Sequence, residues 1–100
     1  MSWLVKVSGP ADRQIQRIDL WWRNNRAKAP DLFTQQIGWA IGFLSETPLL
    51  GSPVVTGKRH VRRLLMRKTS YYIYYDVNEP TGCVEIRAVW HASRGKTPRL

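Results

Sequence analysis

The stretch that most constrains how this chain can fold is residues 71–77, which read Tyr-Tyr-Ile-Tyr-Tyr-Asp-Val. Aromatic and β-branched residues fit the pleated surface of a strand, and the period of two separates the side chains into two sets. One face carries Tyr71, Ile73, Tyr75 and Val77, and the other carries Tyr72, Tyr74 and Asp76. The first face is apolar enough for a core. The second is polar and aromatic, so it is either a half-solvated wall or the floor of a site.

Three further segments have strand character. Residues 3–7 alternate and stop at a Ser-Gly-Pro turn, while residues 61–66 lead through a short connection into the tyrosine strand. Residues 83–90 follow a turn at residues 78–82, and their period of two puts Val84, Ile86, Ala88 and Trp90 on one face. Residues 47–53 hold two prolines and a glycine and are predicted to form a loop. The tail, residues 91–100, is expected to fray or to dock loosely.

Two helical patterns separate the first strand from the others. Apolar residues recur at helical spacing in residues 11–23 and again in residues 31–45, as Ala11, Ile15, Ile18 and Trp22, and as Phe33, Ile37, Ala40 and Leu44. The short connection between them predicts an antiparallel hairpin, and Gly38 and Gly42 would leave a flat strip for close approach of the first helix or the sheet. We therefore expect one domain over residues 1–100 with an α+β fold of order β-α-α-β-β-β, a small antiparallel sheet with a helical hairpin packed on one face.

The net charge of +9, from sixteen Lys+Arg against seven Asp+Glu, exceeds what solubility asks of a small domain. It favours a polyanionic or acidic partner. The single cysteine, Cys83, excludes an intramolecular disulfide, and no apolar run approaches the roughly 20 residues of a membrane-spanning helix, so a cytoplasmic protein without a membrane segment is expected. No phosphate-binding loop, zinc pattern or nucleophile elbow is present, and we expect no cofactor and no metal.

Basic and aromatic residues suggest two binding surfaces. Residues 58–68 contain six cations, and if Arg62 and Arg87 share a sheet face with Tyr72 and Tyr74, they form a patch of the kind that grips phosphates. The alternative is an ordinary solvated face, because alternation within a strand does not determine the register between strands. Trp21 falls at the margin of the core stripe of its helix and Trp39 lies off the stripe of the second helix, which favours a protein-binding surface over simple edge packing.

Four segments carry a resemblance to a known family. They are residues 44–51, which read Leu-Ser-Glu-Thr-Pro-Leu-Leu-Gly, residues 61–65, the tyrosine strand, and residues 89–95, which read Val-Trp-His-Ala-Ser-Arg-Gly. With these segments in this order and the predicted layout, nearly the whole chain resembles the ParE/RelE superfamily of bacterial toxins, and specifically its ParE-like, plasmid-stabilisation branch.

The resemblance implies the toxin of a type II toxin-antitoxin module. Its partner would be a small cognate ParD-like antitoxin, whose acidic, partly disordered segment wraps the toxin in a hetero-oligomer. Toxins of the ParE branch trap DNA gyrase on cleaved DNA. Those of the RelE branch cut ribosome-bound mRNA without a metal, using Lys, Arg and Tyr side chains.

The resemblance also bears on the choice of branch. The mRNA-cutting toxins usually carry an arginine on the central strand, where this chain has Tyr72, and a basic residue with a tyrosine near the C-terminus, where it has Ala92 and Pro98. Arg62, His91 and Arg94 could in principle substitute. The comparison thus favours a gyrase inhibitor without catalysis of its own, with a metal-independent endoribonuclease or a non-toxic basic binding module as alternatives. No residue is assigned a catalytic role, and direct contact with nucleic acid stays possible.

The residues assigned to the two surfaces complete the sequence-based hypothesis. The target-binding candidates are Arg62, Tyr72, Tyr74, Arg87, His91, Arg94 and Lys96. The antitoxin-binding candidates are Trp21, Trp39, Arg17 and Arg63.

Overall fold

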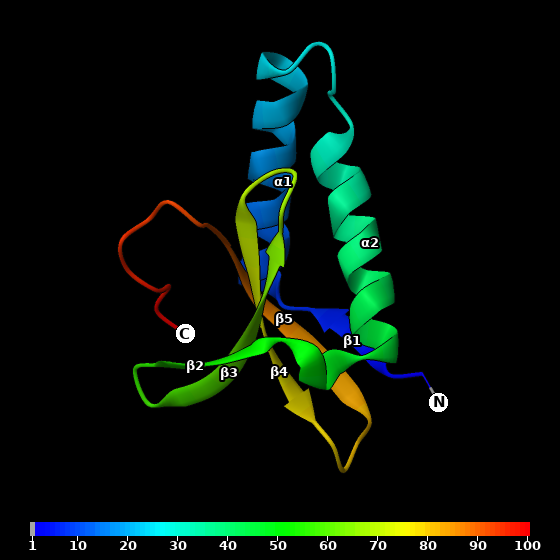
Figure 1. The fold of residues 1–100 in the computed structure, drawn as a ribbon, viewed down its shortest axis with the longest axis vertical. Coiled ribbons are helices and arrows are strands. Elements are labelled where there is room, and N and C mark those ends of the chain that lie inside the picture. The colour runs from blue at the N-terminus through cyan, green and yellow to red at the C-terminus, as the bar shows by residue number, and fades with distance from the viewer. Residues whose placement is uncertain (1) are drawn as a thin grey trace.

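A computed structural model describes residues 2–100, in which two helices cover one face of a five-stranded sheet (Figure 1). The elements in chain order are β1 (Leu4–Val7), α1 (Gly9–Asn25), α2 (Leu32–Glu46), the short 3-10 helix η1 (Pro48–Leu50), β2 (Ser52–Thr56), β3 (Arg59–Met66), β4 (Tyr71–Asn78) and β5 (Cys83–His91). The strands lie in the order β1-β5-β4-β3-β2, which puts the tyrosine strand β4 in the middle. The predicted α+β class and helical hairpin are confirmed.

The sheet is mixed, so the prediction of an antiparallel sheet is wrong at one edge. β1 runs parallel to β5, with Leu4 opposite Cys83 and Val7 opposite Ile86. The two helices supply the long crossover that separates β1 from the remaining strands, whereas tight hairpins join all the other neighbours.

A fifth strand, β2, begins within the segment predicted to be a loop. It pairs antiparallel with β3, and Gly57 adopts a φ of 60° in the turn between the two strands. Pro53 is tolerated because β2 is an edge strand, where a missing N–H does not interrupt a ladder on both sides. This strand was not predicted from the sequence because Pro53 was read as a sign of a loop.

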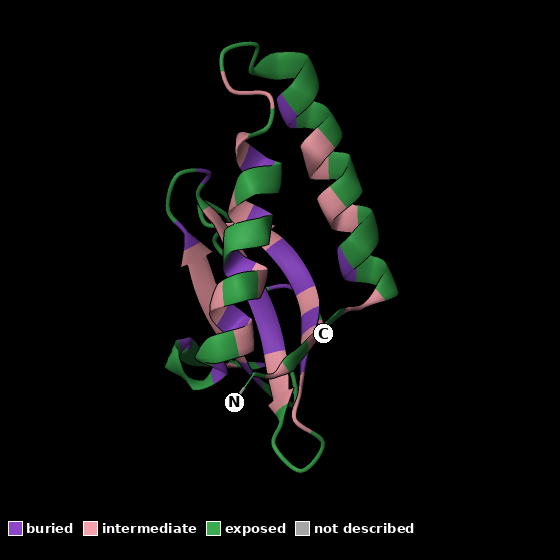
Figure 2. Ribbon diagram, turned by 90° about the vertical axis from the view of Figure 1, so that its right-hand side faces the viewer, coloured by how far each residue is buried: buried purple, intermediate pink, exposed green. Residues whose placement is uncertain are grey.

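The main core lies between the helices and the sheet. The predicted stripe of α2, Phe33, Ile37, Ala40 and Leu44, is buried at every position, and α1 contributes Ala11 and Trp22. Figure 2 shows these buried positions on the sides of the helices that face the sheet. The outer sides are exposed and include Gly38 and Gly42, where an added Cβ would meet nothing within 4 Å. The expected glycine strip for close packing is therefore wrong.

A bulge in β5 divides its side chains between the two faces of the sheet. Tyr74 pairs with Ala88 whereas Tyr75 pairs with Ile86, so Arg87 is an extra residue in the ladder. Val84 and Ile86 consequently join the core under the helices, while Ala88 and Trp90 join a second cluster with Val61 and Tyr74. The prediction that Val84, Ile86, Ala88 and Trp90 share one face is wrong for this reason.

The C-terminal tail docks on the face of the sheet opposite the helices. Pro98 is buried, and Leu100 packs against the cluster of Val61, Tyr74 and Ala88. The indole Nε1 of Trp90 donates a hydrogen bond of 2.8 Å to the carbonyl oxygen of Lys96. The tail thus covers part of the second cluster.

Candidate functional site

The face of the sheet opposite the helices carries arginines laid over aromatic rings. The guanidinium of Arg63 lies 4.1 Å from the ring centroid of Tyr72 and donates a hydrogen bond of 3.3 Å to Tyr74 Oη. Arg94, three residues after the end of β5, lies 4.1 Å from the ring centroid of Trp90 on that strand. Stacking fixes where such a cation points and leaves its edge donors free for an anionic group. We call Arg63, Tyr72, Tyr74, Trp90 and Arg94 the cationic aromatic face.

Arg62 lies on the other side of the sheet. It pairs with Tyr75, whose side chain is in the core under the helices, and its Nη1 donates a hydrogen bond of 2.8 Å to the carbonyl oxygen of Gly51. The register therefore places Arg63, and not Arg62, beside Tyr72 and Tyr74.

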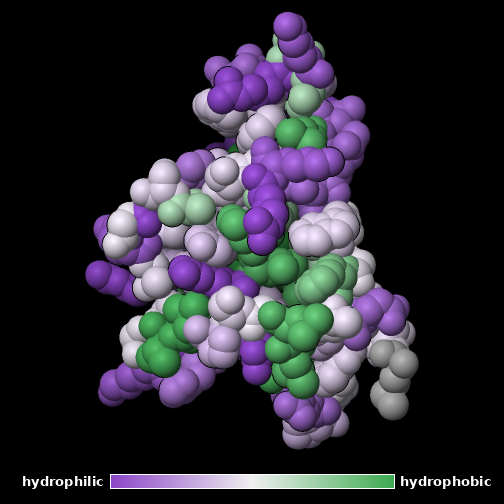
Figure 3. Space-filling view, viewed as in Figure 1, coloured by the Kyte–Doolittle hydropathy of each residue, from purple (hydrophilic) through white to green (hydrophobic). Residues whose placement is uncertain are grey.

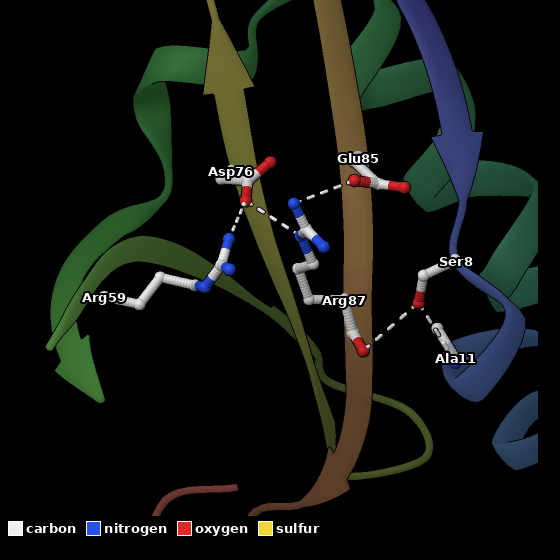
Figure 4. A network of polar contacts seen from close by, with 6 residues as sticks. All are labelled: Ser8, Ala11, Arg59, Asp76, Glu85 and Arg87. Carbon is white, nitrogen blue, oxygen red and sulfur yellow. Dashed lines mark hydrogen bonds and ion pairs between the residues drawn. The ribbon is translucent and has the colours of Figure 1, made fainter. Parts of the chain in front are cut away.

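An ion-pair network lies on the same face of the sheet at the bulge (Figure 4). Asp76 Oδ2 accepts from Arg59 Nη1 at 3.1 Å and from Arg87 Nε at 2.8 Å, and Arg87 Nη2 lies 2.9 Å from Glu85 Oε1. The positive charges of two arginines and the negative charges of two carboxylates cancel in this network. Arg87 therefore adds little net positive charge to the face. Ser8 Oγ donates a hydrogen bond of 3.4 Å to the carbonyl oxygen of Arg87, which ties the bulge to the N-cap of α1.

Beyond the bulge, β5 has an open edge because β1 ends at Val7. Gln14 on α1 closes part of it, since its Oε1 accepts a hydrogen bond of 2.8 Å from the backbone N–H of Val89. Next to this contact lies a pocket of about 290 Å³ between α1 and the end of β5, which we call the α1–β5 cleft. Its lining is Gln14, Arg17, Ile18, Tyr71, Val89, Trp90, His91 and Arg94.

His91 has a defined orientation in this cleft. Its Nδ1 accepts a hydrogen bond of 3.1 Å from the backbone N–H of Ser93 and lies 2.6 Å from Ser93 Oγ. The neutral ring therefore carries its proton on Nε2. The ring meets Tyr71 edge to face, with centroids 4.9 Å apart, and burial raises the pKa of the Tyr71 hydroxyl, an effect that the nearby charge of Arg94 partly offsets.

Two more pockets continue around the turn between β3 and β4. One, of about 460 Å³, shares Tyr71 and His91 with the α1–β5 cleft and extends to Trp21, Arg26 and Lys68. The other, of about 400 Å³, shares Lys68 with it and reaches Trp39 on α2. We call these two pockets the hairpin groove. Figure 3 shows exposed hydrophobic residues set among hydrophilic ones on the side of the molecule seen in Figure 1.

The groove combines exposed indole rings with cations. Trp21 and Trp39 keep 46% and 49% of their surface exposed, which is high for tryptophan in a small domain. Arg26 lies 5.0 Å from the ring centroid of Trp21. Beneath it, the buried Trp22 Nε1 has no hydrogen-bond partner within residues 2–100. Such a surface suits a partner that carries both acidic and apolar side chains.

The predicted site residues separate into several places. Of the target-binding candidates, Tyr72 and Tyr74 belong to the cationic aromatic face, although Tyr74 is only 1% exposed, and Lys96 is exposed in the tail. Arg94 lies where the cationic aromatic face meets the cleft, and His91 lies in the cleft. Arg62 donates a hydrogen bond to the carbonyl oxygen of Gly51, and Arg87 is paired with Asp76 and Glu85. Of the antitoxin-binding candidates, Trp21 and Trp39 line the hairpin groove, Arg17 lines the cleft and Arg63 lies on the opposite face of the sheet.

Sequence reasoning missed the residues whose roles depend on neighbouring elements. Gln14 covers a strand edge that only the tertiary structure creates, and Arg26 and Lys68 reach the hairpin groove from loops. The one available signal was the position of Arg26 four residues after Trp22, near the end of a predicted helix. Asp76 was correctly placed on the face of Tyr72 and Tyr74, but its arginine partners could not be read without the register.

Within residues 2–100, no group of three or more His, Cys, Asp or Glu side chains is close enough to hold a metal ion. Along the same residues, no helix combines the length and hydrophobicity needed to cross a bilayer.

Comparison with known proteins points to one family. The family model described as the ParE toxin of the type II toxin-antitoxin system parDE matches residues 5–95. Among curated proteins, none matches the chain significantly.

Solved structures share the fold. The toxin-antitoxin complex RelBE2 from Mycobacterium tuberculosis contains a similar chain, with a TM-score of 0.63 and 20% identity over 91% of this chain and 99% of that one. A mutant of the E. coli toxin RelE in the free state gives a TM-score of 0.59 and 16% identity, over 93% of this chain and 86% of that one. The isolated E. coli RelE toxin gives 0.57 and 16%, over 94% and 88%.

Proposed function

The chain belongs to the ParE toxin family of type II toxin-antitoxin systems, and from that premise we propose that it stops growth by trapping DNA gyrase on cleaved DNA. A small, acidic, ParD-like antitoxin would hold it inactive in a hetero-oligomer. Both the toxin and its target would then act in the cytoplasm.

The arrangement of the cationic aromatic face carries this proposal. Cleavage of RNA needs a base for the 2′-hydroxyl and an acid for the leaving oxygen, both close to the phosphate. Tyr72 lies at the centre of the face, with Arg63 stacked on its ring. The nearby carboxylates of Asp76 and Glu85 are paired with arginines, so neither is free to act as a base. His91 faces the core side with Tyr71, its partner in the ladder. The face is therefore better suited to gripping a partner than to acid-base chemistry.

Ribosome-dependent cleavage of mRNA is the second candidate function. The fold shared with RelE, at a TM-score of 0.59, fits this alternative. Arg63 and Arg94 also present donors that could contact a phosphate. A non-toxic basic binding module is the third possibility, supported by the charge of +9 alone.

For the antitoxin we propose the side of the molecule that carries the hairpin groove. Trp21 and Trp39 would receive apolar side chains of the antitoxin, and Arg17 would receive a carboxylate. Arg63, which sequence reasoning assigned to the antitoxin, is proposed instead to contact the target, because it lies with Tyr72 and Tyr74 across the sheet. Folding of a disordered antitoxin segment on this surface would cover the exposed indoles.

Induced expression in E. coli without an antitoxin is expected to arrest growth. If gyrase is the target, double-strand breaks accumulate in the chromosome while transcripts stay intact, since each trapped gyrase holds a cleaved duplex. Pulsed-field electrophoresis and primer extension on abundant mRNAs measure the two quantities, with a frameshifted copy of the gene as the control. Intact DNA with transcripts cut in translated regions would establish the nuclease instead, and unchanged growth would leave only the binding module.

A further inference from the structure

We propose that the α1–β5 cleft is a carboxylate-binding site in which Arg17 and Arg94 receive acidic side chains of the antitoxin segment. The inference rests on the proposed function only in that the latter supplies an acidic protein partner. It adds the α1–β5 cleft as the place of the charge contact and Arg94 as the second arginine, beside Arg17, that makes it.

Neither arginine of the cleft is paired with a carboxylate among the described residues. Within residues 2–100, Arg17 and Arg94 make no ion pair, whereas Arg23, Arg59 and Arg87 all do. The carboxylates nearest to Arg17 along α1 are already engaged. Asp12 accepts from Gln16. Asp19 accepts from Thr34 and from Arg23, and these two contacts hold the pKa of the Asp19 carboxyl below its usual value.

The geometry of the cleft fits a planar anion. Stacking on Trp90, at 4.1 Å from the ring centroid, restricts the direction of the Arg94 guanidinium. Arg17 lines the same pocket from α1, and His91 carries the proton of its neutral ring on Nε2. Two arginines that line one pocket can each offer charge-assisted hydrogen bonds to a carboxylate.

The aromatic rings of the cleft argue against nucleic acid as the occupant. A base would need an uncovered ring to stack on. Arg94 covers Trp90, and Tyr71 is already in edge-to-face contact with Phe33 at 5.4 Å and with His91 at 4.9 Å. An acidic side chain needs no such platform, so the cleft favours a protein segment.

The cleft continues into the hairpin groove, so it suits an extended segment. The two share Tyr71 and His91, and the groove then offers Trp21, Arg26 and Lys68. A chain lying along this path would place carboxylates near Arg17 and Arg94 and an apolar side chain near Trp21. A segment in which acidic and apolar residues alternate can supply both the carboxylates and the apolar side chain.

One consequence links the two predicted surfaces. Arg94 also belongs to the cationic aromatic face that we propose for the target, so an antitoxin segment bound in the cleft would cover one of the target-binding residues. Neutralisation would then follow from occupancy of Arg94, without a change in the fold of the toxin.

The test is a titration of the purified chain with a labelled synthetic peptide of alternating Glu and Leu. Arg17→Gln and Arg94→Gln are each expected to weaken binding about tenfold, because each removes one charge-assisted contact. Arg13→Gln is the matched control: it removes the same charge from the same helix at a residue outside the cleft lining, and it should change the affinity by about twofold or less. A peptide of alternating Gln and Leu should bind much more weakly than the Glu peptide.

A second measurement does not depend on the variants. In the unaltered chain, the Glu peptide should shift the NMR signal of the Trp90 indole N–H, because Arg94 lies on that ring. Equal losses for all three arginine variants, or an unmoved Trp90 signal, would overturn the proposal. Binding of a single-stranded DNA oligonucleotide that Arg17→Gln and Arg94→Gln abolish would instead assign the cleft to phosphates. The titration involves neither gyrase nor growth, so its outcome is independent of whether the proposed toxin activity holds.

Discussion

Replacement of Gly51 by alanine is expected to lower the free energy of unfolding by about 3 kcal/mol, the combined cost of overpacking and of a lost buried hydrogen bond. A Cβ at Gly51 would overlap the hydroxyl of Tyr75 and lie 3.0 Å from the carbonyl oxygen of Arg63. That hydroxyl donates to the Pro48 carbonyl at 2.6 Å and accepts from the Gly51 N–H at 3.1 Å, and its burial raises the pKa of Tyr75. The contact joins the end of the helical hairpin to the central strand.

The backbone at Gly51 does not itself demand glycine, since its φ is −67° and its ψ is 153°. The whole penalty therefore comes from the lost space beside Tyr75, and thermal unfolding should show a midpoint lower by about 10–20 °C for a chain of this size. Gly42→Ala is the control, because its Cβ meets nothing and alanine is about 1 kcal/mol better than glycine within a helix. Similar midpoints for the two variants would mean that Tyr75 does not pack against Gly51.

Tyr72→Ala is expected to raise the concentration of toxin needed to trap gyrase by about 30-fold, the effect typical of an aromatic hot spot in an interface. Tyr72 is half-buried on the central strand and supports the guanidinium of Arg63. Without the ring, Arg63 keeps its charge but loses the surface that orients it. The measurement is the dose dependence of gyrase-mediated linearisation of a supercoiled plasmid.

Tyr72→Phe separates the ring from its hydroxyl. The phenyl ring still supports Arg63, so this variant should trap gyrase at close to the concentration required by the unaltered toxin. Unaltered activity of Tyr72→Ala, in a protein whose unfolding midpoint shows that it is folded, would remove the cationic aromatic face from the contact with the target.

Periodicity sufficed to predict the elements that form the core. The stripe of α2 and the inward face of the tyrosine strand each depend only on spacing within one element. Relations between elements could not be predicted in the same way. The parallel pairing of β1 with β5 depends on where the crossover returns, and the bulge at Arg87 reverses the faces of Ala88 and Trp90 without any sign in the local pattern.

The candidate site was predictable to the same extent. Trp21 and Trp39 were correctly read as exposed, because a side chain off the stripe of an amphipathic helix has no core to enter. The choice between Arg62 and Arg63 required the register of β3 against β4, which alternation within each strand leaves open. The α1–β5 cleft arises because β1 is shorter than β5, a property of the assembled sheet rather than of any one segment.

The most direct measurement of the central claim incubates the purified protein with gyrase, ATP and supercoiled plasmid, followed by detergent and protease. The account predicts linear DNA that increases with toxin concentration and is absent when gyrase is omitted. Parallel reactions with programmed ribosomes should leave the mRNA whole. Undisturbed gyrase turnover together with mRNA cut only on ribosomes would contradict the claim.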